Sequence, residues 1–509
     1  MKIIRKRVEK MKYLLSILAL LLIIIGLAYG LLFTSPGNNI LKPVIESKIS
    51  QNVPLPTKLE TFVLRPDRFE LLLKIGDDSV IETKGRMNLA AQSIDAAYSV
   101  DIKDLASLQK LTDMKLNGPF KTEGIVKGDK KLLKIEGVSD VAKSDTKYDV
   151  TLKEFKPSLL GARVAHLSIE SLLYMLNQPV YAKGKIDIDA DIRGLDPEDL
   201  EGTVITTISN GVVQPEPVRR DFNISIPSNL VFKGDIDTVL KGTKAISKVI
   251  FKSSVANLFS KAVSFDIKSG ELTADYKAEV PDLDKLYFLT NQHMKGDIVV
   301  DGDLKVAGKK VRATAHSNTL GGMFDAVFEN GIAKVDIRNI QTVALTDMLL
   351  YPHIFDSRVN AKLNYDTLKQ LGNLHAELLN GQILPNKMSF MLQQLANFDI
   401  TKEVYERTTI DTKIVKKKLI SDLYMKSRLT EIKSEKGLID LDNQTIDTKL
   451  EVKIRKLMLP VLLKGKLTSP EVKVETKGLL KSKAKEEIEK RLPDKLKGTP
   501  AGELLKGLF

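Results

Sequence analysis

The feature that most constrains this chain of 509 residues is a period-two alternation of apolar and charged residues. Residues 186–193 and 446–454 place an apolar residue at nearly every second position, with Asp, Glu, Lys or Arg between them. Shorter runs follow the same pattern at 98–102, 148–152, 222–226 and 472–474. This period is typical of β-strands with one buried face. The sequence therefore predicts a mainly β chain whose strands present an apolar face and a charged face.

The strands recur in a loose unit that ends on an Asn-Gly step. Three copies open near residues 183, 295 and 357 and reach Asn-Gly steps at 210–211, 330–331 and 380–381. Asn and Gly tolerate the positive φ that tight hairpin turns need. We therefore expect degenerate hairpin repeats that build an elongated, curved antiparallel sheet.

Helical periodicity is confined to four inserts, at 167–176, 236–262, 340–350 and 387–395. About 25 strands at a spacing of roughly 4.8 Å would give an apolar face about 120 Å long. Four helices are too few to cover more than part of such a face. An exposed apolar surface of that size is unusual on a soluble monomer.

Two arrangements would keep this apolar face out of water. The sheet could fold on itself into a sandwich or solenoid with a dry core, or it could stay open as a groove that holds acyl chains. We favour the groove, because it gives a single purpose to the sheet and to the two membrane-facing ends described next. The candidate lining residues are Ile186, Ile188, Ile192, Ile446, Leu450, Val452 and Ile454.

Residues 13–33 contain no Asp, Glu, Lys, Arg or His. A helix of this length, about 31 Å, would cross a bilayer core of about 30 Å. We predict a single transmembrane helix here, with Tyr13 and Phe33 at its ends and Leu20 and Ile24 within it. The six basic residues among 1–12 keep this end in the cytoplasm by the positive-inside rule. The remainder of the chain would lie on the opposite side of the membrane from the cytoplasm.

A cleaved signal peptide is the alternative interpretation of this segment. Its apolar region would be about 7 to 15 residues long, with small residues at a cleavage site after it. The observed run is longer, and residues 34–39 (TSPGNN) predict a helix stop instead. We therefore favour an uncleaved anchor.

The formal net charge of +13 lies mostly at the two ends of the chain. Residues 1–12 and 464–509 each carry +5, which leaves +3 for the residues between them. A nucleic-acid module would gather bases and aromatic residues on one domain, so we expect no nucleic-acid partner. Basic ends beside apolar segments favour contact with anionic lipid head groups. Residues 477–509 accordingly predict a basic amphipathic tail, with a solvated capping helix as the alternative.

Two stretches near the C-terminus, 437–450 (GLIDLDNQTIDTKL) and 459–474 (LPVLLKGKLTSPEVKV), resemble the closing pattern of the AsmA family of bacterial envelope proteins. That family is related more distantly to TamB and YhdP. The anchor supports the resemblance. The central residues resemble the family only as β-rich repeats with Asn-Gly turns. The resemblance implies a periplasmic β-groove protein, anchored in the inner membrane, that takes part in phospholipid movement or homeostasis between the two membranes.

We therefore expect a protein of the bacterial inner membrane with its bulk in the periplasm. Its expected partners are membrane lipids and an outer-membrane or periplasmic protein, and we expect no cofactor other than bound phospholipid. The alternative function is a scaffold that presents strand edges to outer-membrane proteins. The expected regions are a cytoplasmic tail (1–12), the anchor (13–33), an N-terminal β region (34–160), two β repeats with helical inserts (161–290 and 291–400), a closing β region (401–476) and the basic tail (477–509).

The sequence contains no recognisable catalytic motif, so we predict that the chain is not an enzyme. Its five His are far apart, it has no Cys, and it lacks nucleophile-elbow and phosphate-loop motifs. Asp187, Asp189 and Asp191 share one strand face, where a solvated face is favoured over a Ca²⁺ site. Asn223 begins an Asn-x-Ser sequon and is a candidate for glycosylation, although we favour an unmodified strand residue.

Overall fold

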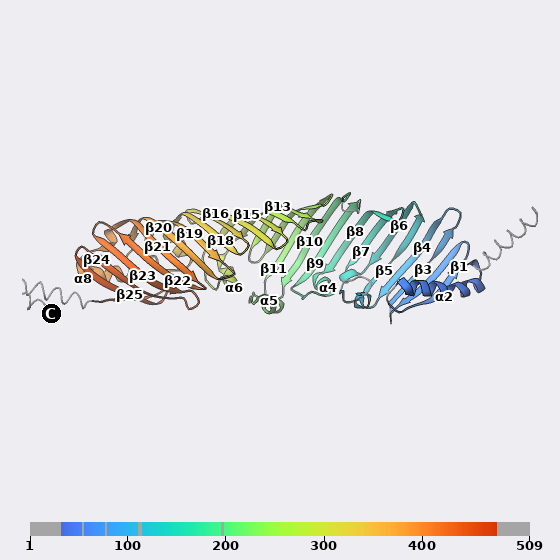
Figure 1. The fold of residues 1–509 in the computed structure, drawn as a ribbon, viewed down its shortest axis with the longest axis horizontal. Helices are drawn as coiled ribbons and strands as arrows, with labels where there is room; N and C mark the ends of the chain where they lie inside the picture. Colours follow the sequence, from blue (N-terminus) through green and yellow to red (C-terminus); the bar gives the residue numbers. More distant parts are fainter. Residues whose placement is uncertain (1–31, 53–54, 77–78, 110–114, 195–197, 476–509) are drawn as a thin grey trace, which may run out of the picture. The chain divides into compact units, whose positions relative to one another are not determined.

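The computed structural model describes residues 32–475 except 53–54, 77–78, 110–114 and 195–197. Over these residues the chain is mainly β, and its 26 strands form one open antiparallel sheet (Figure 1). The predicted class, mainly β with helical inserts and repeated hairpins, is confirmed at this level. The described residues form two compact units, which divide within strand β13 (Asn257–Asp266).

Unit 1 is a meander in which each strand from β1 to β12 pairs antiparallel with the next. Its strands are β1 (Thr57–Leu64), β2 (Arg68–Ile75), β3 (Ser79–Asn88), β4 (Ser93–Ile102), β5 (Phe120–Asp129), β6 (Leu132–Ser139), β7 (Asp145–Lys153), β8 (Lys156–Ser168), β9 (Ala182–Arg193), β10 (Glu201–Val213), β11 (Val231–Lys241) and β12 (Lys244–Ser253). Its helices are α2 (Ser35–Asn52), η1 (Leu105–Leu108), η2 (Val141–Lys143), α4 (Ile169–Met175) and α5 (Pro215–Phe222).

Unit 2 repeats this arrangement, with consecutive antiparallel pairing from β14 to β26. Its strands are β14 (Leu272–Val280), β15 (Ile298–Ala307), β16 (Lys310–Thr319), β17 (Gly322–Glu329), β18 (Ile332–Gln341), β19 (Phe355–Asp366), β20 (Leu371–Ile383), β21 (Val404–Val415), β22 (Lys418–Lys426), β23 (Thr430–Asp440), β24 (Thr445–Ile454), β25 (Leu457–Lys466) and β26 (Glu471–Val474). Its helices are η3 (Leu283–Leu286), α6 (Tyr287–Thr290), α7 (Thr342–Met348), α8 (Lys387–Ala396) and η4 (Ile400–Lys402).

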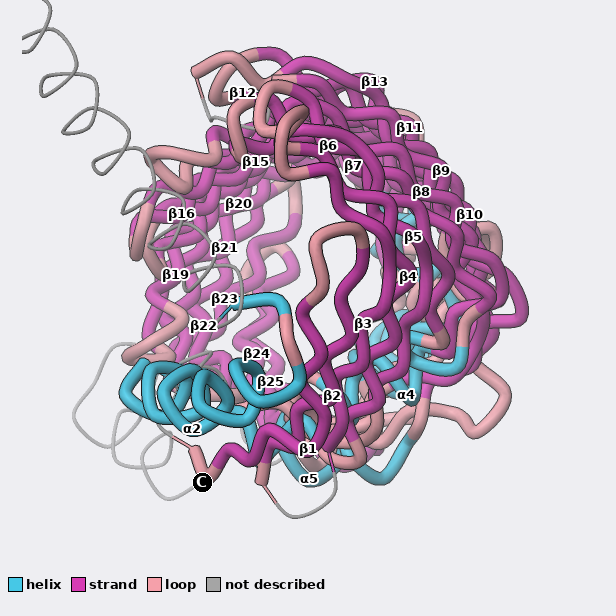
Figure 2. The backbone as a smooth tube through the Cα atoms, turned by 90° about the vertical axis from the view of Figure 1, so that its right-hand side faces the viewer, coloured by secondary structure: helices cyan, strands magenta, loops and turns pink. Residues whose placement is uncertain are grey.

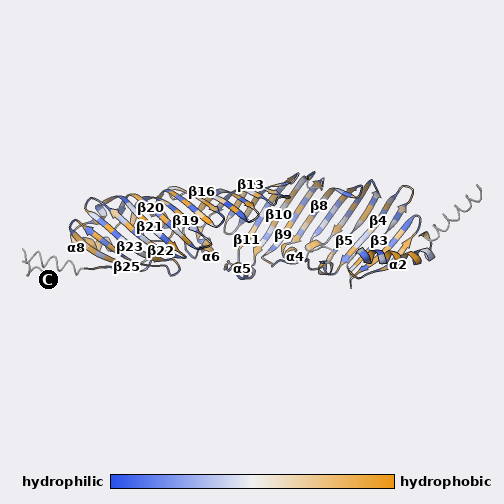
Figure 3. Cartoon of the chain, in the orientation of Figure 1, coloured by the Kyte–Doolittle hydropathy of each residue, from blue (hydrophilic) through white to orange (hydrophobic). Residues whose placement is uncertain are grey.

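The strands of both units separate apolar from charged side chains, as the alternation predicts. Figure 3 shows the result as alternating hydrophobic and hydrophilic bands along many of the strands, for example β8 to β10. In β9, for example, Asp189 and Asp191 are exposed, whereas Ile188 and Ile192 are partly buried. Predicted strands at 98–102, 148–152, 186–193, 446–454 and 472–474 are confirmed as parts of β4, β7, β9, β24 and β26.

Helices pack on the apolar face of the sheet in both units. In unit 1, Ile45 and Ile49 of α2 contact the buried residues of β1 and β2, and Met175 of α4 belongs to a core with β4 and β8. In unit 2, Leu345 of α7 and Leu392 of α8 occupy the equivalent cores. These four cores hold most of the buried apolar side chains of the described residues.

Three of the four predicted helical inserts are confirmed, as α4, α7 and α8. The insert predicted at 236–262 is wrong, because this segment forms β11, β12 and most of β13, with a turn at Gly242 (φ 55°). The strand predicted at 222–226 is also wrong. Phe222 ends helix α5, which begins with Pro215 at its first turn, where proline is tolerated.

The helix stop predicted at 34–39 is only a bend at Thr34, after which α2 begins with Pro36 in its first turn. Of the residues named for the anchor, Tyr13, Leu20 and Ile24 lie outside the described residues, as does the predicted tail at 477–509. Phe33 is described and immediately precedes the bend. Within the described part of the chain, no helix has the length and apolar character needed to cross a bilayer.

Four helices follow a strand that contains a β-bulge. In β8, β10, β18 and β20 the pairing register shifts beside a residue with positive φ, namely His166, Asn210, Asn339 and Asn380. Helices α4, α5, α7 and α8 begin a few residues later. The order bulged strand, helix, strand, bulged strand, helix thus occurs once in each unit. The Asn-Gly step at 330–331 makes the predicted hairpin turn, but those at 210–211 and 380–381 lie in bulges instead.

Candidate functional site

An uninterrupted row of uncharged side chains crosses the apolar face of unit 1. Register pairing joins one residue from each strand from β4 to β12: Ala96, Val126, Ile135, Val150, Leu160, Ile192, Gly202, Leu240 and Ala245. Ala96 and Leu240 are buried, and the others are half-buried. We call this set the unit 1 row. It lies toward the end of the strands opposite the cores of α2 and α4.

A corresponding row crosses unit 2 from β14 to β25. Its members are Ala274, Leu304, Ala313, Phe328, Ala333, Tyr365, Gly372, Ile414, Leu419, Ile439, Ile446 and Gly465. All are half-buried except Gly465, which is exposed. We call this set the unit 2 row. It too lies toward the strand ends opposite the cores of α7 and α8.

The seven predicted lining residues all point to the apolar face, but not all of them are accessible. Ile192 belongs to the unit 1 row and Ile446 to the unit 2 row, and Ile188 is half-buried beside Val164 and Thr206. Ile186 packs against the α4 core. These positions are separated from the charged residues of their strands by the pleat.

The other three predicted lining residues require a correction. Leu450, Val452 and Ile454 are 7%, 0% and 2% exposed and belong to the same core as Leu392 of α8. They form a closed protein core rather than an open wall. The helix predicted at 387–395 is correct, but the sequence pattern does not show that it folds over this end of β24.

Aromatic rings repeatedly cover glycine residues on the apolar face, a feature that the sequence analysis missed. In each case the ring and the glycine are cross-strand partners: Tyr98 with Gly124, Tyr148 with Gly137, Phe232 with Gly211, Phe251 with Gly234, Tyr276 with Gly302 and Tyr365 with Gly372. A Cβ at Gly137 would lie 2.7 Å from Cζ of Tyr148. The missing side chains let the rings lie along the sheet. A Gly in a strand directly opposite an aromatic position is the signal that could have identified these pairs.

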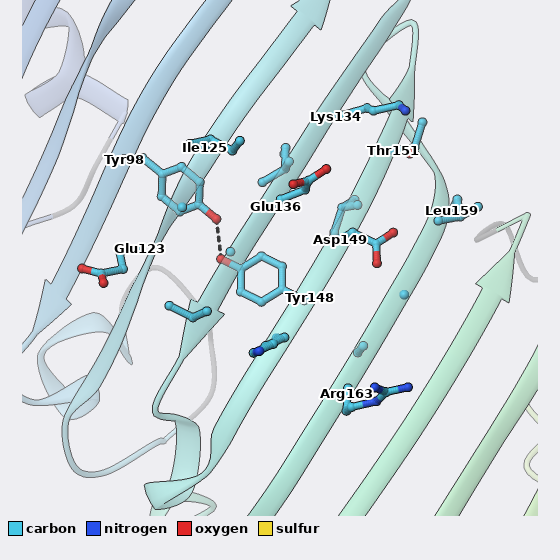
Figure 4. A pocket seen from close by; sticks show the side chains of 18 of the residues that line it. Tyr98, Glu123, Ile125, Lys134, Glu136, Tyr148, Asp149, Thr151, Leu159 and Arg163 are labelled. Carbon is cyan, nitrogen blue, oxygen red and sulfur yellow. Dashed lines mark hydrogen bonds between the residues drawn. The ribbon is translucent and has the colours of Figure 1, made fainter.

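Tyr98 and Tyr148 meet across two strands of the apolar face. Their hydroxyl groups are 2.5 Å apart (Figure 4). Tyr148 also bonds Thr122, 2.6 Å away, whose hydroxyl donates to the carbonyl of Val138. Burial raises the pKa of the Tyr98 phenol above its ordinary value, and its hydrogen bond with Tyr148 adds to the rise. The Tyr98 phenol therefore stays neutral, and the two hydroxyl groups satisfy one another within an otherwise apolar surface.

The charged face carries shallow depressions rather than a convergent polar site. One of about 1120 Å³ is lined mainly by charged-face residues of β3 to β9, including Glu123, Glu136 and Arg163 (Figure 4). Another of about 750 Å³ in unit 2 includes His375 and Asp411. Within the described ranges, no group of three or more His, Asp or Glu side chains is arranged to hold a metal ion.

The three aspartates of β9 have separate partners. Asp187 accepts a 2.7 Å hydrogen bond from the backbone N–H of His166 in the bulge of β8. Asp189 pairs with Arg163 at 3.1 Å, and Asp191 is 3.7 Å from Arg193. In unit 2, Asn360 accepts the equivalent bulge hydrogen bond from Asn339, at 2.8 Å. Asp187 and Asn360 therefore perform the same structural task in the two units.

Each of the five histidines lies beside a carboxylate. His293, His316 and His375 have a ring nitrogen 2.7 Å from Asp284, Asp325 and Asp411. His166 and His353 make longer contacts with Asp145 and Asp347, at 3.5 and 3.8 Å. The hydrogen bond to Asp411 raises the pKa of His375. These are five separate surface pairs on different strands and loops.

Asn223 lies at the end of helix α5 rather than in a strand. It is exposed and adopts a left-handed conformation (φ 57°, ψ 34°), and its N–H donates to the carbonyl of Arg219. Asn is favoured at this kind of helix terminus, so its side chain has a conformational role whether or not it is modified.

Helix α2 closes the outer edge of β1, the first strand of the sheet. Asn38, Lys42 and Glu46, spaced four residues apart, bond the backbone groups of Leu64, Glu60 and Leu59. An unpaired strand edge is a template for pairing with another chain. Side chains of α2 occupy this edge and so remove that template.

Comparison of the sequence with models of known protein families gives no match, and a search of curated proteins gives none either.

Proposed function

We propose that this protein is an AsmA-type periplasmic protein, anchored in the bacterial inner membrane, which holds phospholipid acyl chains in a groove formed by the apolar face of its sheet. It would carry or conduct lipid, and so contribute to lipid transport or outer-membrane homeostasis, without catalysing a reaction. Membrane lipids would be its partners, and bound phospholipid would be its ligand.

The two apolar rows carry this proposal. No charged residue interrupts either row, and most of their side chains are half-buried rather than packed beneath a helix. Burial of hydrocarbon contributes about 0.8 kcal/mol per methylene group. A chain of many methylene groups that lies along a row would therefore gain several kcal/mol without any polar contact.

Strand curvature in unit 1 supports a groove in that unit. The strands bend, and α4, which packs on the apolar face, lies on the inner side of the bend formed by β8, β9 and β10 (Figure 2). This arrangement favours the apolar face as the concave one. An acyl chain on a concave face contacts side chains on more than one side, which increases the area removed from water.

Helix α8 limits where lipid would lie in unit 2. Its side chains already bury Val452 and Ile454, so the proposed binding surface in this unit runs beside Ile446 and the rest of the unit 2 row. The aromatic-over-glycine pairs fit the same function, because rings that lie along the sheet fill gaps without projecting into the path of a chain.

Co-purified lipid provides a direct test of the proposal. We expect phospholipid in mass spectra of the detergent-extracted protein, and less of it in Val150→Asp, which places a charge in the unit 1 row. Thr151→Asp is the matched control, since its side chain lies on the charged face of the same strand. Absence of lipid from the folded wild-type protein, or equal loss in both variants, would contradict the proposal.

The alternative scaffold function depends on free strand edges, and the structure restricts it. The edge of β1 is occupied by side chains of α2. Among the described strands, the other terminal strand is β26, which is four residues long and pairs with β25. A scaffold would therefore have to recruit its clients at β26. Binding of outer-membrane protein precursors to lipid-free protein, abolished by a proline at Val472, would favour this alternative.

A further inference from the structure

The outward side of helix α2 has an unusual composition for a surface helix. The ten exposed positions among its described side chains are Ser35, Pro36, Asn39, Ile40, Pro43, Val44, Ser47, Lys48, Ser50 and Gln51. Lys48 is the single charged residue in this set, although 28% of the whole chain is charged. Ile40 and Val44, one helical turn apart, are 58% and 55% exposed.

The inward side of α2 is fixed to the sheet. Ile45 and Ile49 pack on the buried residues of β1 and β2, and three polar side chains bond the edge of β1 as described above. The exposed apolar pair on the opposite side is therefore not a consequence of loose packing. It faces away from the core while the helix is held at several points.

The start of α2 is joined to the sheet at the point where the predicted anchor ends. Arg65, in the turn between β1 and β2, donates to the carbonyl of Phe33 and to the hydroxyl of Ser35, both at 2.7 Å. Phe33 is the last residue of the predicted transmembrane segment. Helix α2 begins two residues later, at Ser35. If the anchor spans the bilayer, the start of α2 must therefore lie close to the membrane surface.

We propose that the outward face of α2 lies on the lipid surface of the membrane, with Ile40 and Val44 inserted at the boundary between head groups and acyl chains. This inference rests on the proposed anchor and adds an orientation to it. Interfacial helices bury an apolar face in this boundary and keep basic rather than acidic residues nearby. The outward face of α2 has this composition, with an apolar pair, one Lys and no acidic residue among its described side chains.

Contact of α2 with the membrane would also position the first strands of the sheet. Since α2 is bonded along β1, contact of α2 with the bilayer would place β1 and β2 at the membrane surface as well. Lipid could then enter the apolar face of unit 1 at this end without crossing bulk water.

Fluorescence quenching at single labelled positions tests the inference. The chain has no Cys, so Ile40→Cys and Val44→Cys each provide a unique site for an environment-sensitive dye. The full-length protein would be reconstituted in vesicles of phosphatidylethanolamine and phosphatidylglycerol, with or without lipids that carry a nitroxide on the upper acyl chain. Glu216→Cys in α5 is the control, because Glu216 is also exposed on a helix of unit 1.

We expect blue-shifted emission and nitroxide quenching at positions 40 and 44, and neither effect at position 216. Solvent-like emission at 40 and 44 in protein that stays in the membrane fraction would overturn the inference and leave the anchor intact. A blue shift without quenching would also overturn it, because it would show that protein rather than lipid covers α2. Release of the protein from the membrane by carbonate would overturn the anchor together with the inference.

Discussion

The side-chain amide of Asn38 pairs with the backbone of Leu64 as a residue of a neighbouring strand would. Its Oδ1 accepts the N–H of Leu64 at 2.7 Å, and its Nδ2 donates to the carbonyl of Leu64 at 3.2 Å. Nδ2 also donates to the carbonyl of Leu32 at 2.9 Å. One buried amide thus joins the residues before α2, the helix itself and the edge of the sheet. The relationship explains how an open sheet begins without exposing a full strand edge.

Loss of this amide should destabilise the edge. We expect Asn38→Ala to lower the free energy of unfolding by about 1–3 kcal/mol, because Asn38 is 4% exposed and its partners would lose their hydrogen bonds. The variant should also associate with itself more readily through the uncovered β1. Urea unfolding and size-exclusion chromatography would measure these effects, and Asn39→Ala, on the exposed side of the same helix, should show neither.

Glycine at position 137 should be required by the tyrosines beside it. A Cβ there would lie 2.5 Å from the hydroxyl of Tyr98 and 2.7 Å from Cζ of Tyr148, so Gly137→Ala should displace both rings at a cost of about 1–3 kcal/mol. At Gly234 the nearest atom to an added Cβ is 3.2 Å away, and Gly234→Ala should cost less. Equal effects of the two substitutions on chemical denaturation would argue against the ring-over-glycine interpretation.

The bulge of β8 should depend on Asp187 more than on its neighbour. Asp187→Ala removes the acceptor for the N–H of His166 and should cost about 0.5–1.5 kcal/mol. Asp189→Ala removes only an exposed pair with Arg163 and should cost less than about 1 kcal/mol. Asp187→Asn keeps the acceptor oxygen and should preserve stability, whereas a Ca²⁺ site would not tolerate it. Thermal unfolding with and without Ca²⁺ distinguishes these outcomes.

Protonation of His375 should stabilise unit 2 slightly at low pH. Its hydrogen bond with Asp411 raises its pKa above 6.5 in the folded state, so the folded protein binds this proton more tightly than the unfolded protein does. The stabilisation is therefore complete below about pH 6.5 and is lost as the pH rises through the higher folded value. His375→Asn should reduce the urea midpoint at pH 5.5 and leave it unchanged at pH 9. A larger effect at pH 9 would contradict the assigned direction.

Local patterning was sufficient to predict five of the six strands named from the sequence, and the two chemically distinct faces. The alternation at 186–193 leaves one arrangement in which Ile188 and Ile192 avoid water and Asp189 and Asp191 reach it, because a strand turns successive side chains to opposite faces. Three short helices were also predictable from apolar spacing. The segment 236–262 was not, because its apolar residues fit both periods, and pairing with neighbouring strands decided the outcome.

Tertiary relationships account for the features that the sequence did not indicate. The bulges at His166 and Asn339 need an acceptor supplied by the next strand, and nothing local distinguishes that acceptor from other polar residues. Burial of Val452 depends on α8, which lies far from it in sequence. The role of α2 as an edge cover was hidden by Pro36 and Gly37, which predict a stop when no sheet is considered.

Photo-crosslinking at two adjacent residues tests the central claim most directly. A photoreactive amino acid in place of Ile192 would face the apolar side of unit 1, and the same group in place of Asp191 would face the charged side of the same strand. After irradiation of the membrane-embedded protein, we predict phospholipid adducts at position 192 and none at 191. Adducts at neither position in folded protein, or at both positions equally, would contradict the account.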